Sequence, residues 1–288
     1  MPSTSPRIVF VTGKGGVGKS YVARLLAHSQ AEAGRRVALL NCDGRPAAAS
    51  AQGQTSKAAY GGVDIVDFDE GRALAALVGR VIPLAFVARR LLSSRTFAAV
   101  AAAAPGIADL ALLWTIAGLA DGRTGVYDLV VVDGPASGQA LKVVGAPRAT
   151  TGLGLFGRMD SLARDLEEML GDAQRFRALV VTTAEELAVL ETQVLVDGLA
   201  ERGVDVAAVV ANAVWPRHCN REQEDWLTKN PSSYDSVHYL SVRREQLRAL
   251  AALTGPRPPF VVAYRFDSGT DDTDAARALA AHLAEAWT

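Results

Sequence analysis

Residues 7–21 read RIVFVTGKGGVGKSY, and this stretch decides the fold. Its apolar run from Ile8 to Val11 is typical of a short strand that is buried on both faces. A helical pattern follows from Tyr21 to Ala33, and four glycines lie between the two segments. The order of strand, glycine-rich turn and helix indicates the first unit of an α/β sheet.

The turn satisfies the P-loop pattern of Gly, any four residues, Gly, Lys and Ser or Thr. Its glycines let backbone N–H groups turn toward a phosphate, and the helix that follows presents its positive end. Lys19 can reach the β- and γ-phosphates, and the Ser20 hydroxyl can bind Mg²⁺. The predicted nucleotide contacts are Gly13, Lys14, Gly15, Gly16, Val17, Gly18, Lys19, Ser20 and Tyr21. A glycine turn that binds nothing is the alternative.

The composition of the 288 residues is that of an ordinary globular protein, with 49% hydrophobic and 21% charged residues. A net charge of −1 gives no basic field for nucleic acid or an anionic membrane. No signal peptide is visible, and the longest apolar stretches, within 97–120, are too short to span a bilayer. Cys42 and Cys219 suggest neither a zinc site nor a disulfide framework. We expect a cytoplasmic protein without an integral membrane segment.

Apolar strands and helical patterns alternate along the rest of the chain. Strands are predicted at Arg36–Leu40, Val63–Asp69 (short or at an edge), Tyr127–Val132, Ala178–Val181, Val206–Val210 and Phe260–Ala263. Helical segments are predicted over 71–120, with breaks at its prolines, over Leu153–Gly171 and over Thr273–Trp287. A further helix is predicted to begin at Thr183, with Glu186 three residues on as its capping partner. A loop is predicted at Thr228–Ser236. The pattern predicts an α/β fold with a doubly wound, mostly parallel sheet and helices on both faces. The chain is expected to form a single P-loop domain over 1–288, with a small Ala/Leu-rich helical insertion over 71–126.

Asp133 follows an apolar strand, as the metal-binding aspartate of a P-loop protein does. It is predicted to hold a water on Mg²⁺ or to bond Ser20, so that Ser20 and Asp133 form the metal site for a bound ATP. An aspartate that only caps the next turn is the alternative.

Lys14 lies inside the loop, and the octet GKGGVGKS resembles the deviant Walker A ATPases, which include MinD, ParA, nitrogenase iron protein, ArsA and the tail-anchored-protein targeting ATPases. The resemblance implies that Lys14 crosses a dimer interface to the partner's nucleotide. Without the surrounding octet, Lys14 would be better interpreted as a solvated loop lysine, which remains the alternative.

Three further blocks resemble the ArsA-like branch of that group. Residues 133–138 are similar to its switch II, although Gln139 replaces the branch's histidine. Residues 181–192 resemble its Pro-Glu-x-Leu-Ser-x-x-Glu-Thr helix. Residues 209–216 resemble its Val-Asn-x-x-x-Pro segment, which implies that Asn212 reads adenine; a turn-forming asparagine is the alternative.

The resemblance also implies a switch I at Asp43, which would orient the attacking water and act with Lys14 in catalysis. Gly44 and Arg45 separate Asp43 from the Pro-Ala pair that follows it directly in the family, so this switch is altered, and a helix-capping Asp43 is the alternative. Arg265 is expected in a loop over the base.

These features predict a dimeric ATPase that couples ATP-driven closure to a partner or client, the other subunit being a second copy or a paralogue. One alternative is a nucleotide-binding subunit that hydrolyses ATP weakly or not at all, paired with a paralogue. Another is a membrane-protein targeting factor with an apolar client groove. Two cysteines are too few for an arsenite site.

Overall fold

The computed structural model describes residues 6–42, 56–60, 62–81, 106–121, 127–151, 157–215, 217–230, 234–253, 260–264 and 281. Asp43 and Arg265 lie outside the described residues, as does all but residue 281 of the helix predicted from Thr273 to Trp287. The subdomain predicted over 71–126 stays a prediction, because residues 82–105 and 122–126 are also outside them.

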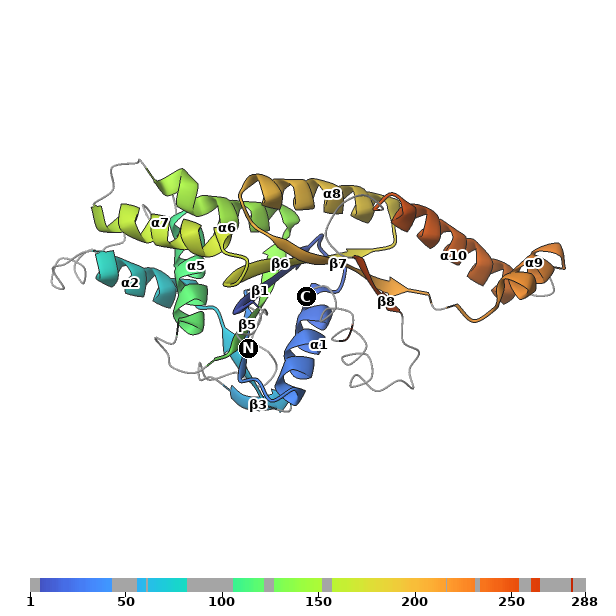
Figure 1. Ribbon diagram of the computed structural model, residues 1–288, viewed down its shortest axis with the longest axis horizontal. Helices are drawn as coiled ribbons and strands as arrows, with labels where there is room; N and C mark the ends of the chain where they lie inside the picture. Colours follow the sequence, from blue (N-terminus) through green and yellow to red (C-terminus); the bar gives the residue numbers. More distant parts are fainter. Residues whose placement is uncertain are drawn as a thin grey trace.

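The described strands form one sheet of eight strands in the order β3-β4-β2-β5-β1-β6-β7-β8 (Figure 1). Their bounds are Ile8–Gly13 (β1), Val37–Asn41 (β2), Ser56–Tyr60 (β3), Val63–Asp67 (β4), Leu129–Ala136 (β5), Phe176–Thr183 (β6), Val206–Val214 (β7) and Phe260–Tyr264 (β8). Every neighbouring pair is parallel except β3 with β4. The predicted α/β class with a mostly parallel sheet is therefore confirmed.

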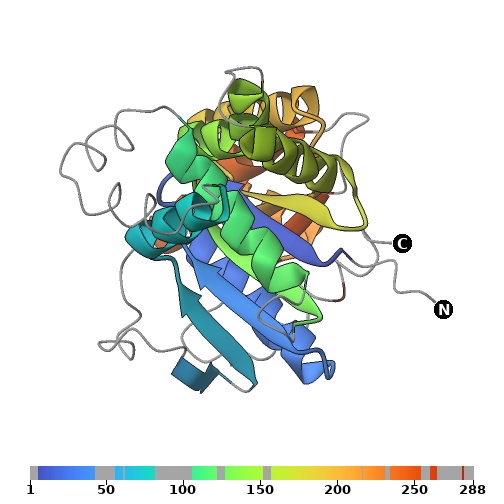
Figure 2. The same ribbon diagram turned by 90° about the vertical axis from the view of Figure 1, so that its left-hand side faces the viewer.

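Helices cover both faces of the sheet (Figure 2). They are Lys19–Glu32 (α1), Glu70–Val81 (α2), Ile107–Ala120 (α5), Ser137–Thr150 (α6), Gly157–Gly171 (α7), Glu186–Glu201 (α8), Arg221–Lys229 (α9) and Tyr234–Ala251 (α10). The buried side of α1 joins one apolar cluster, and α2, α5, α6, α7 and α8 join the other. Among the described residues, no helix has both the length and the hydropathy that a bilayer crossing needs.

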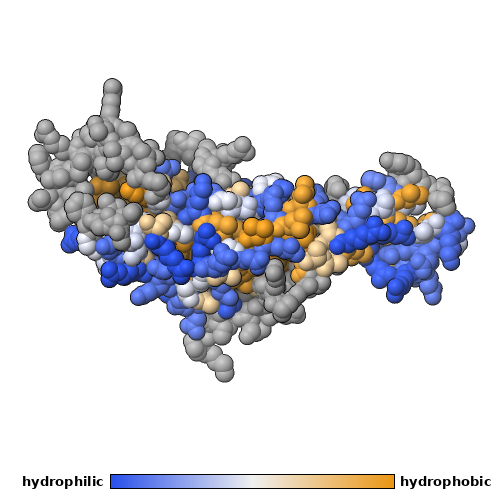
Figure 3. Space-filling view, turned by 90° about the horizontal axis from the view of Figure 1, so that it is seen from above, coloured by the Kyte–Doolittle hydropathy of each residue, from blue (hydrophilic) through white to orange (hydrophobic). Residues whose placement is uncertain are grey.

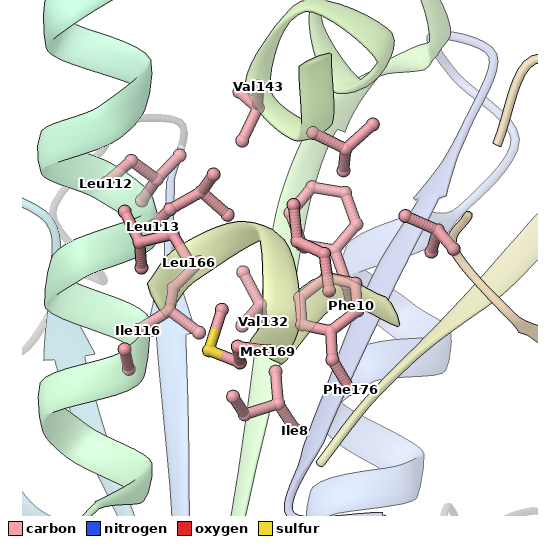
Figure 4. Close-up of a cluster of buried hydrophobic side chains, with 14 of the residues drawn as sticks. Ile8, Phe10, Leu112, Leu113, Ile116, Val132, Val143, Leu166, Met169 and Phe176 are labelled. Atoms are coloured by element: carbon pink, nitrogen blue, oxygen red, sulfur yellow. The ribbon is translucent and has the colours of Figure 1, made fainter. Parts of the chain in front are cut away.

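The central strand β1 explains why the sheet is buried on both faces. Its successive side chains alternate, so Val9 and Val11 belong to the cluster under α1, while Ile8 and Phe10 belong to the opposite cluster. Figure 4 shows Ile8 and Phe10 packed with residues of α5, α6 and α7, including Leu113. Strands of this kind are continuous apolar runs, which is why the sequence pattern identified them.

The strand predicted over Val63–Asp69, as either short or at an edge, is a short one of five residues, Val63–Asp67, and does not lie at the edge. The strand β4 pairs with β2 on one side and with the antiparallel β3 on the other, so β3 is the edge. Accordingly, Val63 and Ile65 are only 2% and 6% exposed. The sequence of β3, SKAAY, carries little strand propensity, and this is why it was missed.

Two predictions around the later helices are wrong. Residues 228–229 belong to α9 and residues 234–236 to α10, so the loop predicted over Thr228–Ser236 is much shorter. Thr183 ends β6 and caps no helix, because α8 begins at Glu186 with Glu185 at its N-cap and no capping side-chain bond. Figure 1 shows α9 and α10 extending away from the sheet.

Candidate functional site

The glycine-rich loop leads from β1 into α1, as the sequence predicts, and it lies tightly against its neighbours. Gly13 has a φ of 150°, and a Cβ atom there would overlap the carbonyl oxygen of Val181 in β6. Gly18 has a φ of 90°, and a Cβ atom there would overlap the side-chain amide of Asn212 in β7. Both positions therefore require glycine for space and for backbone conformation.

Lys19 and Ser20 are the first two residues of α1. No side chain caps this helix, whose N-cap is Gly18, so its N-terminal N–H groups face the loop without a capping acceptor. The Lys19 ammonium donates to the carbonyl oxygen of Lys14 at 3.3 Å and so lies back over the loop. A helix N-terminus with an ammonium folded over it is suited to binding phosphate.

Asn212 braces the loop from β7. Its Nδ2 donates to the carbonyl oxygen of Val17 at 2.9 Å, a bond between residues that are 195 positions apart. The next residue, Ala213, has a φ of 59°, and the pairing of β7 with β8 is irregular between Ala211 and Val214. Asn212 therefore holds the loop in place, and its amide oxygen is still an acceptor that a base could use.

Asp133 lies within β5 rather than at its end, because the strand continues to Ala136. It is 7% exposed and stands in register with Val11 of β1. The segment after it lies close to the start of the loop, since the Thr12 hydroxyl donates to the carbonyl oxygen of Pro135 at 2.9 Å. The switch-like segment and the glycine-rich loop are therefore in direct contact.

Lys14 points away from the loop that contains it. Its ammonium lies 2.8 Å from Oε1 of Glu191, on α8, and the two side chains are 33% and 48% exposed. Glu191 lies in the segment 181–192, whose sequence indicated no role for this residue at the site. No local signal indicated it, because the pairing joins residues far apart in the chain.

Gln139, in the first turn of α6, connects the switch-like segment to α5. Its Nε2 donates to Oδ1 of Asp109 at 2.8 Å. Burial raises the pKa of Asp109 above its ordinary value, and the hydrogen bond from Gln139 acts in the opposite direction. Gln139 thus links the first turn of α6 to α5.

A cavity of about 850 Å³ lies between the start of α8, the end of β7 and α10. Ala213, Trp215, Leu190 and Arg248 are among the residues that line it, and the described lining includes no residue of the glycine-rich loop.

The chain was compared with known proteins. A model of the CobQ/CobB/MinD/ParA nucleotide binding domain matches residues 8–283. The ATPase BagA of Mycobacterium tuberculosis is 28% identical over 245 residues, which cover 80% of this chain and 72% of that protein. A putative ATPase of Mycobacterium bovis matches to the same extent. A putative arsenical pump-driving ATPase of Aquifex aeolicus is 26% identical over 248 residues, covering 74% of this chain and 81% of that protein.

The match to the family model spans nearly the whole chain, and in the structure the glycine-rich loop lies against Asn212 and against β5, which carries Asp133. The chain belongs to the CobQ/CobB/MinD/ParA nucleotide-binding domain family, as an ATPase of the MinD/ParA type.

Proposed function

We propose that the protein is a switch ATPase of the ArsA-like branch that closes as a dimer when it binds ATP and couples that closure to a partner or client. Lys14 acts across the dimer on the nucleotide of the other subunit. The other subunit is a second copy of the chain or a paralogue.

The observation that carries this proposal is that the two lysines of the loop take opposite directions. Lys19 folds over its own loop, whereas Lys14 extends to Glu191 on the outer side of α8. Lys19 is therefore placed for phosphates on its own loop, whereas the Lys14 ammonium is held in a partly exposed ion pair away from it.

The side chains near the loop fit a nucleotide with Mg²⁺. The Ser20 hydroxyl and the Asp133 carboxylate are oxygen ligands, which Mg²⁺ prefers, and a carboxylate that is 7% exposed favours a nearby positive charge. When bound, the ion would neutralise charge on the β- and γ-phosphates. The family resemblance assigns the orientation of the attacking water to Asp43 and contacts with the base to Asn212 and Arg265.

The groove needed by a membrane-protein targeting factor has little support. Apolar residues of α5 could line such a groove, but Leu112, Leu113 and Ile116 are at most 6% exposed and belong to the core, and Trp114 is only partly buried against it. The apolar residues of 86–97, such as Phe86, Leu91 and Phe97, could also line it and lie outside the described residues. Buried side chains stabilise the fold and offer no surface to a client.

The test measures ATP turnover and dimer formation in wild type, Lys14→Ala and Lys19→Ala. We expect Lys19→Ala to lose ATP binding. Lys14→Ala should still bind ATP as a monomer, lose dimerisation, and lose turnover by about 10³-fold, the lower range for a charge supplied by another subunit. Light scattering reports the dimer, and a fluorescent ATP analogue reports binding.

Other outcomes separate the remaining possibilities. Wild-type turnover that Lys14→Ala retains would contradict the crossing lysine. Wild-type protein that binds ATP but neither hydrolyses it nor dimerises would point instead to a subunit that needs an active paralogue.

A further inference from the structure

The outer face of α8 surrounds the ion pair of Lys14 with apolar side chains. Leu187, Leu190 and Val194 are 68%, 48% and 68% exposed. With Glu191 they occupy positions i, i+3, i+4 and i+7, which lie on one face of a helix. Figure 3, which looks onto the helices of this side, shows apolar side chains gathered along the middle of the molecule.

We infer that Glu191 is a latch that holds Lys14 on its own subunit until ATP brings in a second copy, which then covers this face of α8. The inference rests on the proposed function and adds to it the residue that restrains Lys14. Glu191 is thus a positioning residue and touches no nucleotide.

The second copy is the occupant because the face is continuous with the loop that acts on it. Lys14 is part of the glycine-rich loop, and its ammonium lies 2.8 Å from the carboxylate in the middle of the apolar residues. A subunit that receives Lys14 at its nucleotide must therefore approach the side of the molecule where this face begins. Exposed Leu and Val side chains around a single charge pair are typical of a surface that another protein covers.

The latch opposes closure for two physical reasons. Lys14 must leave Glu191 before it can reach the other subunit, so the ion pair is lost. Glu191 then becomes covered without its partner, and a carboxylate without a partner is costly to bury. Nucleotide contributes the compensating interactions, so the latch keeps the resting protein monomeric.

The test compares Glu191→Gln with wild type at a saturating concentration of AMP-PNP and Mg²⁺, with the dimer dissociation constant measured by sedimentation. Two latches open in each dimer, and an exposed ion pair is worth about 0.2–1 kcal/mol. Glu191→Gln should therefore tighten the dimer by about 2- to 30-fold. Glu201→Gln, which removes the same charge ten residues further along α8, should leave the constant unchanged.

Salt and a conservative variant show that the effect comes from the charge. The gap between Glu191→Gln and wild type should shrink at high ionic strength, because the ion pair is exposed and screened. Glu191→Asp should behave like wild type or lie between the two. In addition, Val194→Asp should weaken the dimer and leave binding of a fluorescent ATP analogue to the monomer intact.

The latch would be refuted if wild type dimerises with AMP-PNP while Glu191→Gln and Glu201→Gln give the same constant. Normal dimerisation of Val194→Asp would refute the covered face. Wild type that binds the nucleotide and stays monomeric would overturn the proposed function, and the latch with it, so the two failures are distinguishable.

Discussion

Gly18 is a position in the glycine-rich loop where both the backbone conformation and the space available require glycine. Its φ of 90° is left-handed, and an alanine Cβ would overlap Nδ2 of Asn212. Left-handed backbone costs a non-glycine residue about 1–2 kcal/mol. Forcing the Asn212 side chain away adds about 1–3 kcal/mol. We therefore expect Gly18→Ala to lower the free energy of unfolding by about 2–5 kcal/mol and to weaken ATP binding.

Two neighbouring glycines serve as matched controls for the separate contributions. Gly16 also has a left-handed φ, 86°, but a Cβ there meets nothing within 4 Å, so Gly16→Ala should show the backbone cost alone. At Gly15 a Cβ likewise meets nothing within 4 Å, and no left-handed φ is required. Gly15→Ala should therefore change stability by no more than about 0.5 kcal/mol in either direction.

A double-mutant cycle with Asn212→Ala isolates the overlap. Asn212→Ala alone should cost about 1 kcal/mol, because it removes the hydrogen bond to Val17. In the double variant the overlap with Gly18→Ala is gone, so the pair should cost about 1–3 kcal/mol less than the sum of the single changes. Urea unfolding followed by circular dichroism measures each value. Additivity to within about 0.5 kcal/mol would show that Gly18 and Asn212 do not meet, and would refute this picture of the loop.

Two further predictions concern the body of the fold. Leu113 is fully buried under α5, so Leu113→Ala leaves a cavity and should lower the free energy of unfolding by about 2–5 kcal/mol. As a control, Leu187→Ala, at a 68% exposed position, should leave the free energy of unfolding almost unchanged. At the surface, hydrogen bonds from Arg36 hold the pKa of Asp128 at about 2, below its unfolded value. Because the folded pKa is the lower one, the pair stabilises the fold above about pH 4 and loses this effect as the pH falls toward 2. Wild type should therefore be more stable than Asp128→Asn at pH 6, and the two should converge near pH 2. A difference that is independent of pH would contradict this role of the pair.

Much of the fold was predictable because parallel strands in an α/β protein are buried on both faces. The runs at β1, β2 and β6 are continuously apolar for this reason, and periodicity alone identifies them. The strand β3, which ends the sheet among the described residues, escaped prediction because its sequence carries little apolar signal.

The helices α9 and α10 were missed for a different reason. No residue of α9 is buried, so no apolar face indicated a helix. A local signal was present all the same. Asn220 accepts a hydrogen bond from the backbone of Gln223, and the Gln223 side chain accepts one from the backbone of Asn220. The spacing of Asn and Gln three residues apart is that of a capping box, and it marks the start of α9.

The glycine-rich octet by itself determined that this is a phosphate-binding α/β protein, because glycines, a lysine and a hydroxyl at fixed spacing are what the backbone needs to hold a phosphate. Tertiary structure alone decided what surrounds the octet. It brought Asn212 onto Val17 and Glu191 onto Lys14, across 195 and 177 positions of the chain. Such pairings cannot be predicted from local sequence. They depend on the order of β1, β6 and β7 in the sheet and on α8, the helix that connects β6 to β7.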